Sequence, residues 1–281
     1  MKRLVSVCAM LCLAASCTDQ QAREGNNAGS APLAADGTQA PADPAQPTPA
    51  PSGDDVKPGG ARSVAEETDD FVFEYSYPAQ AGAIPELASL LDRRVERARA
   101  SLTQQAAEGR AAARDNGFPY NKYSSGMEWR VVADLPQWLS MSGQFSSYTG
   151  GAHGIYGLES LVWNKEAAEA VDAIELFTSP QALGEALGTR FCEGLDRLRA
   201  ERREEPIDSD EYGFNACPSI DELTVLVGSG NGRTFNRMTL YAGPYVAGPY
   251  AEGAYEVNLD LDEAILNAVK PEYRESFSAP R

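Results

Sequence analysis

Alternation of apolar and polar residues predicts several β-strands along this chain. In the stretch DFVFEYSY, residues 70–77, aromatic side chains occupy every second position from Phe71 to Tyr77, which is typical of a strand with one buried face. Further strands are expected at about 127–134, 137–148, 155–163, 223–229, 234–243 and 254–261. Short connections that contain glycine or proline join neighbouring strands, which favours antiparallel hairpins.

Helical spacing of apolar residues predicts three helices. One runs from Pro85 to about Asn116, where a glycine follows. Ser179 and Pro180 are an N-cap and a proline at the first helical position, and they predict a second helix that ends near Arg203. A last helix begins at Asp262. A strand, a helix and further strands follow one another twice, so we expect an α+β fold with antiparallel sheets backed by two long helices.

The first 16 residues read as a secretory signal peptide, because Lys2 and Arg3 precede an apolar run about half as long as a membrane span. The run ends LAASC, which resembles the lipobox of bacterial lipoproteins, although Ala14 stands where that family usually has leucine. The resemblance implies a diacylglyceryl group on Cys17 and hence a membrane anchor. Thr18 at the next position implies the outer membrane, facing the periplasm. Ordinary signal cleavage without lipidation is the alternative.

Residues 17–67 are rich in alanine, proline and glycine and contain no aromatic residue. Such a segment cannot bury enough apolar surface to offset its ordering entropy, so we expect a disordered tether. The rest of the chain is long enough for one large domain or for two small interlocked ones, and we divide it into two α+β halves, 68–178 and 179–281.

The chain is strongly acidic, with a formal net charge of −17 that becomes −19 once Lys2 and Arg3 leave with the signal. This charge argues against a nucleic-acid partner, since phosphates require patches of lysine and arginine. It favours solubility and attraction to basic proteins.

Two cysteines remain outside the signal and the lipid site, namely Cys192 and Cys217. In a chain exported to an oxidising compartment we expect them to form a disulfide, with two buried thiols as the alternative. A metal site is not expected, because two sulfurs and one distant histidine make a poor ligand set.

The only histidine, His153, lies in the glycine-rich stretch YTGGAHG, residues 148–154. A short connection with three glycines is what a tight hairpin with positive-φ positions requires. Three roles stay open for His153: a hydrogen bond that fixes the loop, contact with a ligand, and catalysis. The candidate ligand-binding residues in this stretch are Tyr148, Gly150, Gly151 and His153.

A second candidate is the run YAGPYVAGPYAEGAY, residues 241–255, in which tyrosines lie among glycines and prolines. Such tyrosines can form a rigid surface that stacks on sugars or anchors a protein. For each of Tyr241, Tyr245, Tyr250 and Tyr255 the alternative is packing onto the domain's own core. Tyr245 and Tyr250 join the candidate ligand-binding residues.

No catalytic motif accompanies these residues. A G-x-S-x-G nucleophile elbow is missing, one histidine cannot supply a zinc site, and the glycine cluster at 228–232 lacks the Lys-Ser/Thr of a phosphate loop. We therefore expect no catalytic residue, metal or cofactor. An envelope hydrolase that acts through His153 and a nearby hydroxyl is the alternative.

YTGGAHG with the following LVWN strand and IELF, and later LYAGPYVAGPYAEGAYEV with VKPEYRESF, resemble the PdaC/RsiV-like extracytoplasmic domain family over about residues 68–278. Members of this family, largely of unknown function, occur beside a peptidoglycan deacetylase domain and as the lysozyme-binding outer part of an anti-sigma factor. A chain with one histidine has no His-rich deacetylase domain, so deacetylation is not implied, and neither is sigma regulation.

The resemblance and the predicted anchor together lead us to expect a lipid-anchored binding domain of the cell envelope. Its partner would be a basic protein such as lysozyme, or a glycan of the peptidoglycan type. A purely structural envelope lipoprotein is a further hypothesis.

Overall fold

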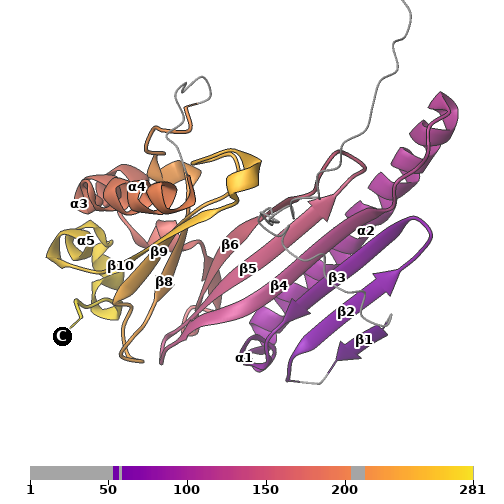
Figure 1. Ribbon diagram of the computed structural model, residues 1–281. Coiled ribbons are helices and arrows are strands. Elements are labelled where there is room, and N and C mark those ends of the chain that lie inside the picture. The colour runs from indigo at the N-terminus through magenta and orange to yellow at the C-terminus, as the bar shows by residue number, and fades with distance from the viewer. Residues whose placement is uncertain (1–52, 57–58, 204–212, 281) are drawn as a thin grey trace, which may run out of the picture. The chain divides into compact units, whose positions relative to one another are not determined.

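The computed structural model describes residues 53–56, 59–203 and 213–280, all within one compact unit of the chain (Figure 1). The signal peptide, Cys17 and most of the expected tether lie outside the described residues. Seven strands form one sheet in the order β1-β2-β3-β4-β5-β6-β7, and three form a second in the order β10-β9-β8. The predicted α+β fold is confirmed. The strands are β1 Gly53–Val56, β2 Arg62–Glu67, β3 Phe71–Tyr77, β4 Tyr123–Asp134, β5 Trp138–Tyr148, β6 Ile155–Asn164, β7 Glu169–Val171, β8 Thr224–Gly228, β9 Arg237–Ala242 and β10 Tyr255–Asp260.

One long helix covers one face of the seven-stranded sheet (Figure 1). This helix, α2 Pro85–Asn116, follows the short α1 Ala79–Gly82, has proline at its first turn, and ends where Gly117 adopts a φ of 71°. Its apolar face meets the aromatic side chains of β3 and the inward residues of β4 to β6 in one core. Because α2 crosses over between them, β3 and β4 pair in parallel, while the other described strand pairs are antiparallel.

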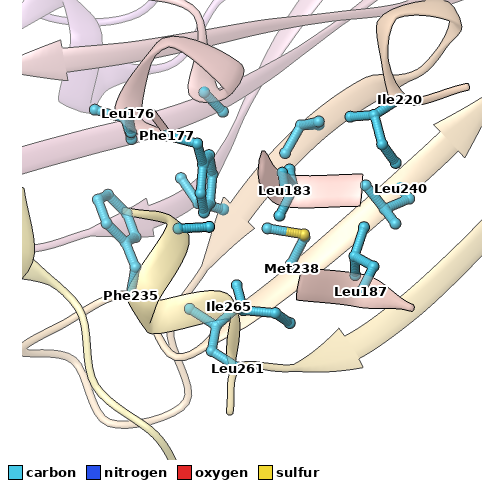
Figure 2. Packing of buried hydrophobic residues seen from close by; sticks show 14 of the residues in the cluster. Leu176, Phe177, Leu183, Leu187, Ile220, Phe235, Met238, Leu240, Leu261 and Ile265 are labelled. Atoms are coloured by element: carbon cyan, nitrogen blue, oxygen red, sulfur yellow. The ribbon is translucent and has the colours of Figure 1, made fainter. Parts of the chain in front are cut away.

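A second core joins the other face of this sheet to the three-stranded sheet, since β8 contacts β4, β5 and β6. Three helices complete it: α3 Pro180–Leu187, α4 Arg190–Arg202 and α5 Glu263–Ala268. Figure 2 shows Leu183 of α3, Met238 of β9 and Ile265 of α5 converging there, and each is at most 1% exposed. Burial of such side chains stabilises the fold by about 2 kcal/mol each.

The predicted boundary of the tether at residue 67 was wrong. β2 lies inside the segment expected to be disordered and pairs antiparallel with β3 from Arg62 to Glu67. Composition missed it because Val64 is its one buried apolar residue. The strand is stabilised instead by backbone pairing and by ion pairs to α2, such as Arg62 to Asp92 at 2.7 Å.

The single helix expected from Pro180 to about Arg203 is two helices. α3 ends at Gly188, whose φ of 56° and ψ of −128° cannot continue a helix, and α4 starts at Arg190. The apolar spacing hid this break because Leu183, Leu187 and Phe191 all remain buried. Ser179 caps α3 as predicted, its hydroxyl accepting from Ala182 N at 3.0 Å.

Among the described residues, none of the helices combines the length and the apolar character that a membrane crossing requires.

Candidate functional site

The glycine-rich stretch forms the hairpin between β5 and β6, as predicted. Ser147 pairs with Ile155, and residues 149–154 make the connection. Gly150 has a φ of 88°, which side-chain-bearing residues rarely adopt, and its position adjoins the ring of Tyr123. The hairpin is therefore shaped by its glycines, and His153 stands exposed near its end.

Most of the tyrosine run forms the loop between β9 and β10, residues 243–254. Tyr245 lies at its turn with a φ of 70°, and its backbone N donates to Gly248 O at 3.1 Å. A positive φ costs a residue such as tyrosine about 1 kcal/mol or more and persists only where the surroundings impose it. Tyr250 begins the short 3₁₀ helix η3 Tyr250–Glu252. The loop thus holds Tyr245 in a conformation that leaves its ring 54% exposed.

His153 brings the hairpin and the tyrosine loop together. Its imidazole stacks on the Tyr250 ring with centroids 3.9 Å apart and an interplanar angle of 23°. Its Nε2 lies 3.1 Å from the Tyr245 hydroxyl, 92 positions away in the sequence, and its Nδ1 lies 2.9 Å from Gly154 O. The carbonyl can only accept, so Nδ1 carries the proton and Nε2 accepts from the Tyr245 hydroxyl when the ring is neutral.

A fourth ring completes the group. Tyr156 of β6 meets Tyr250 edge to face, with centroids 5.9 Å apart at 71°. We call His153, Tyr156, Tyr245 and Tyr250 the aromatic surface. Ile155, the residue before Tyr156 in the strand, is 64% exposed. Exposed rings that lie together, as those of Tyr245 and His153 do, are unusual on a protein surface, and such groups mark interaction sites.

Helix α4 and the residue at its C-cap, Arg203, support the tyrosine loop through arginine side chains. Arg203 binds the Glu252 carboxylate with two hydrogen bonds of 2.8 and 2.9 Å, and Tyr255 donates to the same carboxylate. Arg199, 4% exposed, donates to Ala247 O at 3.0 Å. These contacts tie the middle and the C-terminal end of the loop to α4.

The pKa values of Tyr255 and Glu252 are shifted by the charges around them. Burial and the neighbouring Glu252 carboxylate raise the pKa of Tyr255 to about 12. Burial alone would raise the pKa of Glu252, but the hydrogen bonds from Arg203 and Tyr255 outweigh it and leave that pKa below its ordinary value. The carboxylate therefore stays ionised, as its two hydrogen bonds to Arg203 require.

The predicted disulfide between Cys192 and Cys217 is present, with a Cα–Cα distance of 5.5 Å. It joins α4 to the segment after residue 212. Arg199 also donates to Asn215 O and Ala216 O in that segment, at 3.2 and 2.8 Å. The disulfide and the arginine thus secure the same segment against the same helix.

The structure brings together some of the predicted site residues and separates others. His153, Tyr245 and Tyr250 meet directly. Tyr148 is half-buried and pairs with Ser124 in the sheet, while Gly150 and Gly151 shape the hairpin. Of the other tyrosines in the run, Tyr241 and Tyr255 are core residues, 5% and 1% exposed.

Sequence reasoning missed Tyr156, Ile155 and the arginines of α4. Tyr156 and Ile155 start a predicted strand directly after the glycine hairpin, and this position was the available signal. Arg199 and Arg203 lie among several charged residues at the end of a helix, and no pattern distinguishes the buried arginines from the exposed ones.

The contacts of His153 limit the chemistry that this arrangement offers. Both ring nitrogens of His153 are engaged, by a carbonyl and a phenol, and neither partner is the carboxylate that orients a catalytic histidine. Within the described parts of the chain, no group of three or more His, Cys, Asp or Glu side chains is placed to hold a metal ion. Flat rings with hydrogen-bonding edges are suited to stacking and to hydrogen bonding at once.

Comparison with known protein families gives one match within the sequence. The family model described as "Deacetylase PdaC" matches residues 64–156. The predicted resemblance to PdaC is confirmed over this segment. The PdaC-like segment runs from β2 to the start of β6, so it contains His153 and Tyr156, whereas Tyr245 and Tyr250 lie beyond it. No protein with a curated description matches the chain.

The solved structures that are similar to this chain include two from the DUF3298 family. A member of the DUF3298 family from Bacteroides fragilis NCTC 9343 is 17% identical, with a TM-score of 0.46, and the match covers 73% of this chain and 92% of that one. A DUF3298 family protein from Pseudomonas aeruginosa PAO1 is 18% identical, with a TM-score of 0.45, and the match covers 80% of this chain and 99% of that one.

Proposed function

We propose that this protein is a non-catalytic binding domain of the bacterial cell envelope and that its aromatic surface binds a glycan of the peptidoglycan type. The observation that carries the proposal is the contact of His153 with Tyr245 and Tyr250, which presents an open ring beside hydrogen-bonding groups. Tyrosine has an apolar face for the sugar ring and a hydroxyl for its polar substituents. The match to PdaC and the signal-like N-terminus support a place in the envelope.

Co-sedimentation with purified peptidoglycan tests whether the protein binds this glycan. Tyr245→Ala should weaken binding at least tenfold, because central aromatic anchors contribute more than about 1.4 kcal/mol. Phe118→Ala is the matched control, since Phe118 is also 54% exposed and lies outside the aromatic surface. Equal loss in both variants, or no binding by the parent protein, would contradict the proposal.

A basic protein such as lysozyme is the second candidate ligand, and the net charge of −17 favours it. Electrostatic steering predicts that association with immobilised lysozyme falls steeply between about 20 and 150 mM salt, as the screening length shortens to about 8 Å. A salt-independent association, or none at low salt, would remove this candidate.

Catalysis through His153 is the alternative that turnover assays address. We expect no release of product from muropeptide or ester substrates by the parent protein, because the imidazole contacts the Gly154 carbonyl and the Tyr245 phenol, and neither partner is a carboxylate that would orient it as a base. Turnover that His153→Ala abolishes would instead establish a hydrolase.

We further propose that Cys17 carries the lipid that places this domain at the outer membrane, facing the periplasm. The lipobox-like LAASC supports the assignment. Labelling with a clickable fatty acid should mark the parent protein and not Cys17→Ser, and the variant should leave the membrane fraction, since stable anchoring requires the acyl chains. Equal labelling of both would disprove it. Membrane retention without a lipid would favour a structural role.

A further inference from the structure

One row of side chains crosses the three-stranded sheet on the face that points away from the second core. Thr224 of β8, Tyr241 of β9 and Glu256 of β10 lie directly opposite one another in the pairing of these strands (Figure 1). Residues that are directly opposite in antiparallel strands have their side chains on one face, with Cβ atoms about 5 Å apart. Leu240, the neighbour of Tyr241 in β9, faces the core instead. The side chains of Tyr241 and Glu256 therefore lie next to each other.

This row adjoins the aromatic surface at Tyr156. The Thr224 hydroxyl donates to the carbonyl of Leu158 in β6 at 2.9 Å. Leu158 and Tyr156 lie two positions apart, so they are on the same face of that strand. Burial, followed by the nearby charges of Tyr156 and Glu256, raises the pKa of Tyr241 to about 12. Tyr156, Tyr241 and Glu256 are therefore neighbours, and we call them the acceptor group.

The polar atoms of the acceptor group make no hydrogen bond to any of the described residues. Tyr241 is only 5% exposed, yet within that part of the chain its hydroxyl has no donor or acceptor as a partner. The same holds there for the Tyr156 hydroxyl and for the exposed Glu256 carboxylate. Buried polar groups are normally paired. In the described structure, Ser140 Oγ and Trp163 Nε1 are the side-chain atoms that are closed off from solvent without a partner, and the Tyr241 hydroxyl is not one of them. This hydroxyl therefore points to the surface.

The acceptor group matches the donors of a primary ammonium group. An ammonium group has three N–H donors and no acceptor, while two phenol oxygens and one carboxylate supply three acceptors. The carboxylate also supplies the opposite charge, and hydrogen bonds between charged groups are the stronger ones. A carboxylate or phosphate on the ligand would instead be repelled by Glu256.

We propose that Tyr156, Tyr241 and Glu256 bind the primary ammonium group of an amino sugar whose ring lies against the aromatic surface. This site rests on the glycan binding proposed above and adds which glycans are preferred. The rings of the aromatic surface stack on the sugar, while the acceptor group recognises one of its substituents. Acetylation of the amine removes its charge and two of its three N–H donors, so the protein should distinguish a free amine from an acetylated one.

The test compares two tetrasaccharides of N-acetylglucosamine, one fully acetylated and the other with a single free amine. Calorimetric titration at about pH 6, where the amine is protonated, should show that the amine-bearing chain binds about five- to tenfold more tightly. Glu256→Gln should reduce this preference to about twofold or less, and Tyr241→Phe should reduce it about threefold. Neither variant should move the urea midpoint, because neither group loses a hydrogen bond to the described part of the protein.

Glu272→Gln and Tyr273→Phe are the matched controls. They remove an exposed carboxylate and a phenol hydroxyl from the 3₁₀ helix η4 Pro271–Ser276. The ring of Tyr273 meets Trp138 at the start of β5, whereas the hairpin that carries His153 follows the end of that strand. Both controls should leave the affinity for the two tetrasaccharides unchanged.

The amine site is overturned if both tetrasaccharides bind equally, or if Glu256→Gln leaves the preference intact. It is also overturned if Nα-acetyl-lysine methylamide, an amine without a sugar, binds as tightly as the amine-bearing chain. Equal binding that Tyr245→Ala still weakens would leave the proposed glycan function standing. If neither chain binds, the amine site fails, and co-sedimentation with peptidoglycan then decides whether the glycan function fails with it.

Discussion

Replacing Arg199 with methionine tests whether α4 holds the tyrosine loop in place. The buried guanidinium donates to the carbonyls of Ala247, Asn215 and Ala216 at 3.0, 3.2 and 2.8 Å. Methionine has a similar apolar stem and no donor. Ala247 is fully buried, and without Arg199 its carbonyl keeps only the longer hydrogen bond from Arg203, 3.3 Å, at a cost of about 1 kcal/mol, while the other two carbonyls lie on exposed residues and lose about 0.5 kcal/mol each. The expected loss is about 2 kcal/mol in the free energy of unfolding.

Urea unfolding measures this loss. With an unchanged slope, the midpoint should fall by about 1 M, and the thermal midpoint by about 4–8 °C. The control is Arg197→Met in the same helix, because the exposed Arg197 makes one hydrogen bond, 3.3 Å to Glu193 O. It should change stability by less than about 0.5 kcal/mol.

The NMR signals of His153 give a second measurement on Arg199→Met, because they report whether the tyrosine loop keeps its position. His153 is the only histidine in the chain, so its imidazole signals in an NMR spectrum are unambiguous. Stacking on Tyr250 should shift them, and Arg199→Met should move them toward free histidine. If the variant loses less than about 1 kcal/mol and the signals do not move, the role assigned to Arg199 is refuted.

Three further changes probe the same part of the molecule. Cys192→Ser with Cys217→Ser removes a cross-link between residues 25 positions apart and should lower the unfolding free energy by about 3 kcal/mol; a reduced parent protein that unfolds at the same urea concentration as the oxidised one would contradict this. Gly194→Ala should destabilise the fold by about 1 kcal/mol, because the new methyl group would lie 2.6 Å from a buried valine of β10. Gly184→Ala in α3 should stabilise it by about 0.5 kcal/mol, because its nearest contact is at 3.4 Å. Thermal unfolding of the two variants checks these opposite signs. Because the pKa of Glu252 is lowered, its ionised form stabilises the fold above the ordinary pKa of 4.5, and this contribution is lost as the pH falls below that value. Glu252→Gln should therefore be less stable than the parent at neutral pH. Urea midpoints of the two proteins that differ by the same amount at about pH 3 would disprove this.

Local signals in the sequence were enough for most of the secondary structure. The long helix starts at Pro85 and ends before Gly117, because a proline favours the first turn of a helix and a left-handed glycine ends its last turn, and both effects are local in sequence. The alternation from Phe71 to Tyr77 predicts a strand because successive side chains point to opposite faces. The hairpin around His153 follows from its three glycines in the same way.

Elements whose stability comes from distant partners were beyond this reasoning. β2 carries few apolar residues and is held by its pairing with β3 and by ion pairs with α2. The break at Gly188 leaves the apolar spacing intact, so only the backbone conformation reveals it. Arg199 is buried because carbonyls from two separate loops face it, which no local pattern encodes.

The sequence by itself therefore determined most of the helices and strands, the acidic character and the two candidate loops of this protein. The tertiary structure alone decided that His153 lies against Tyr245 and Tyr250 while Tyr241 and Tyr255 are buried. The physical reason is that a loop's conformation depends on neighbours in sequence, whereas the meeting of two loops 92 positions apart depends on how two sheets and α4 pack together.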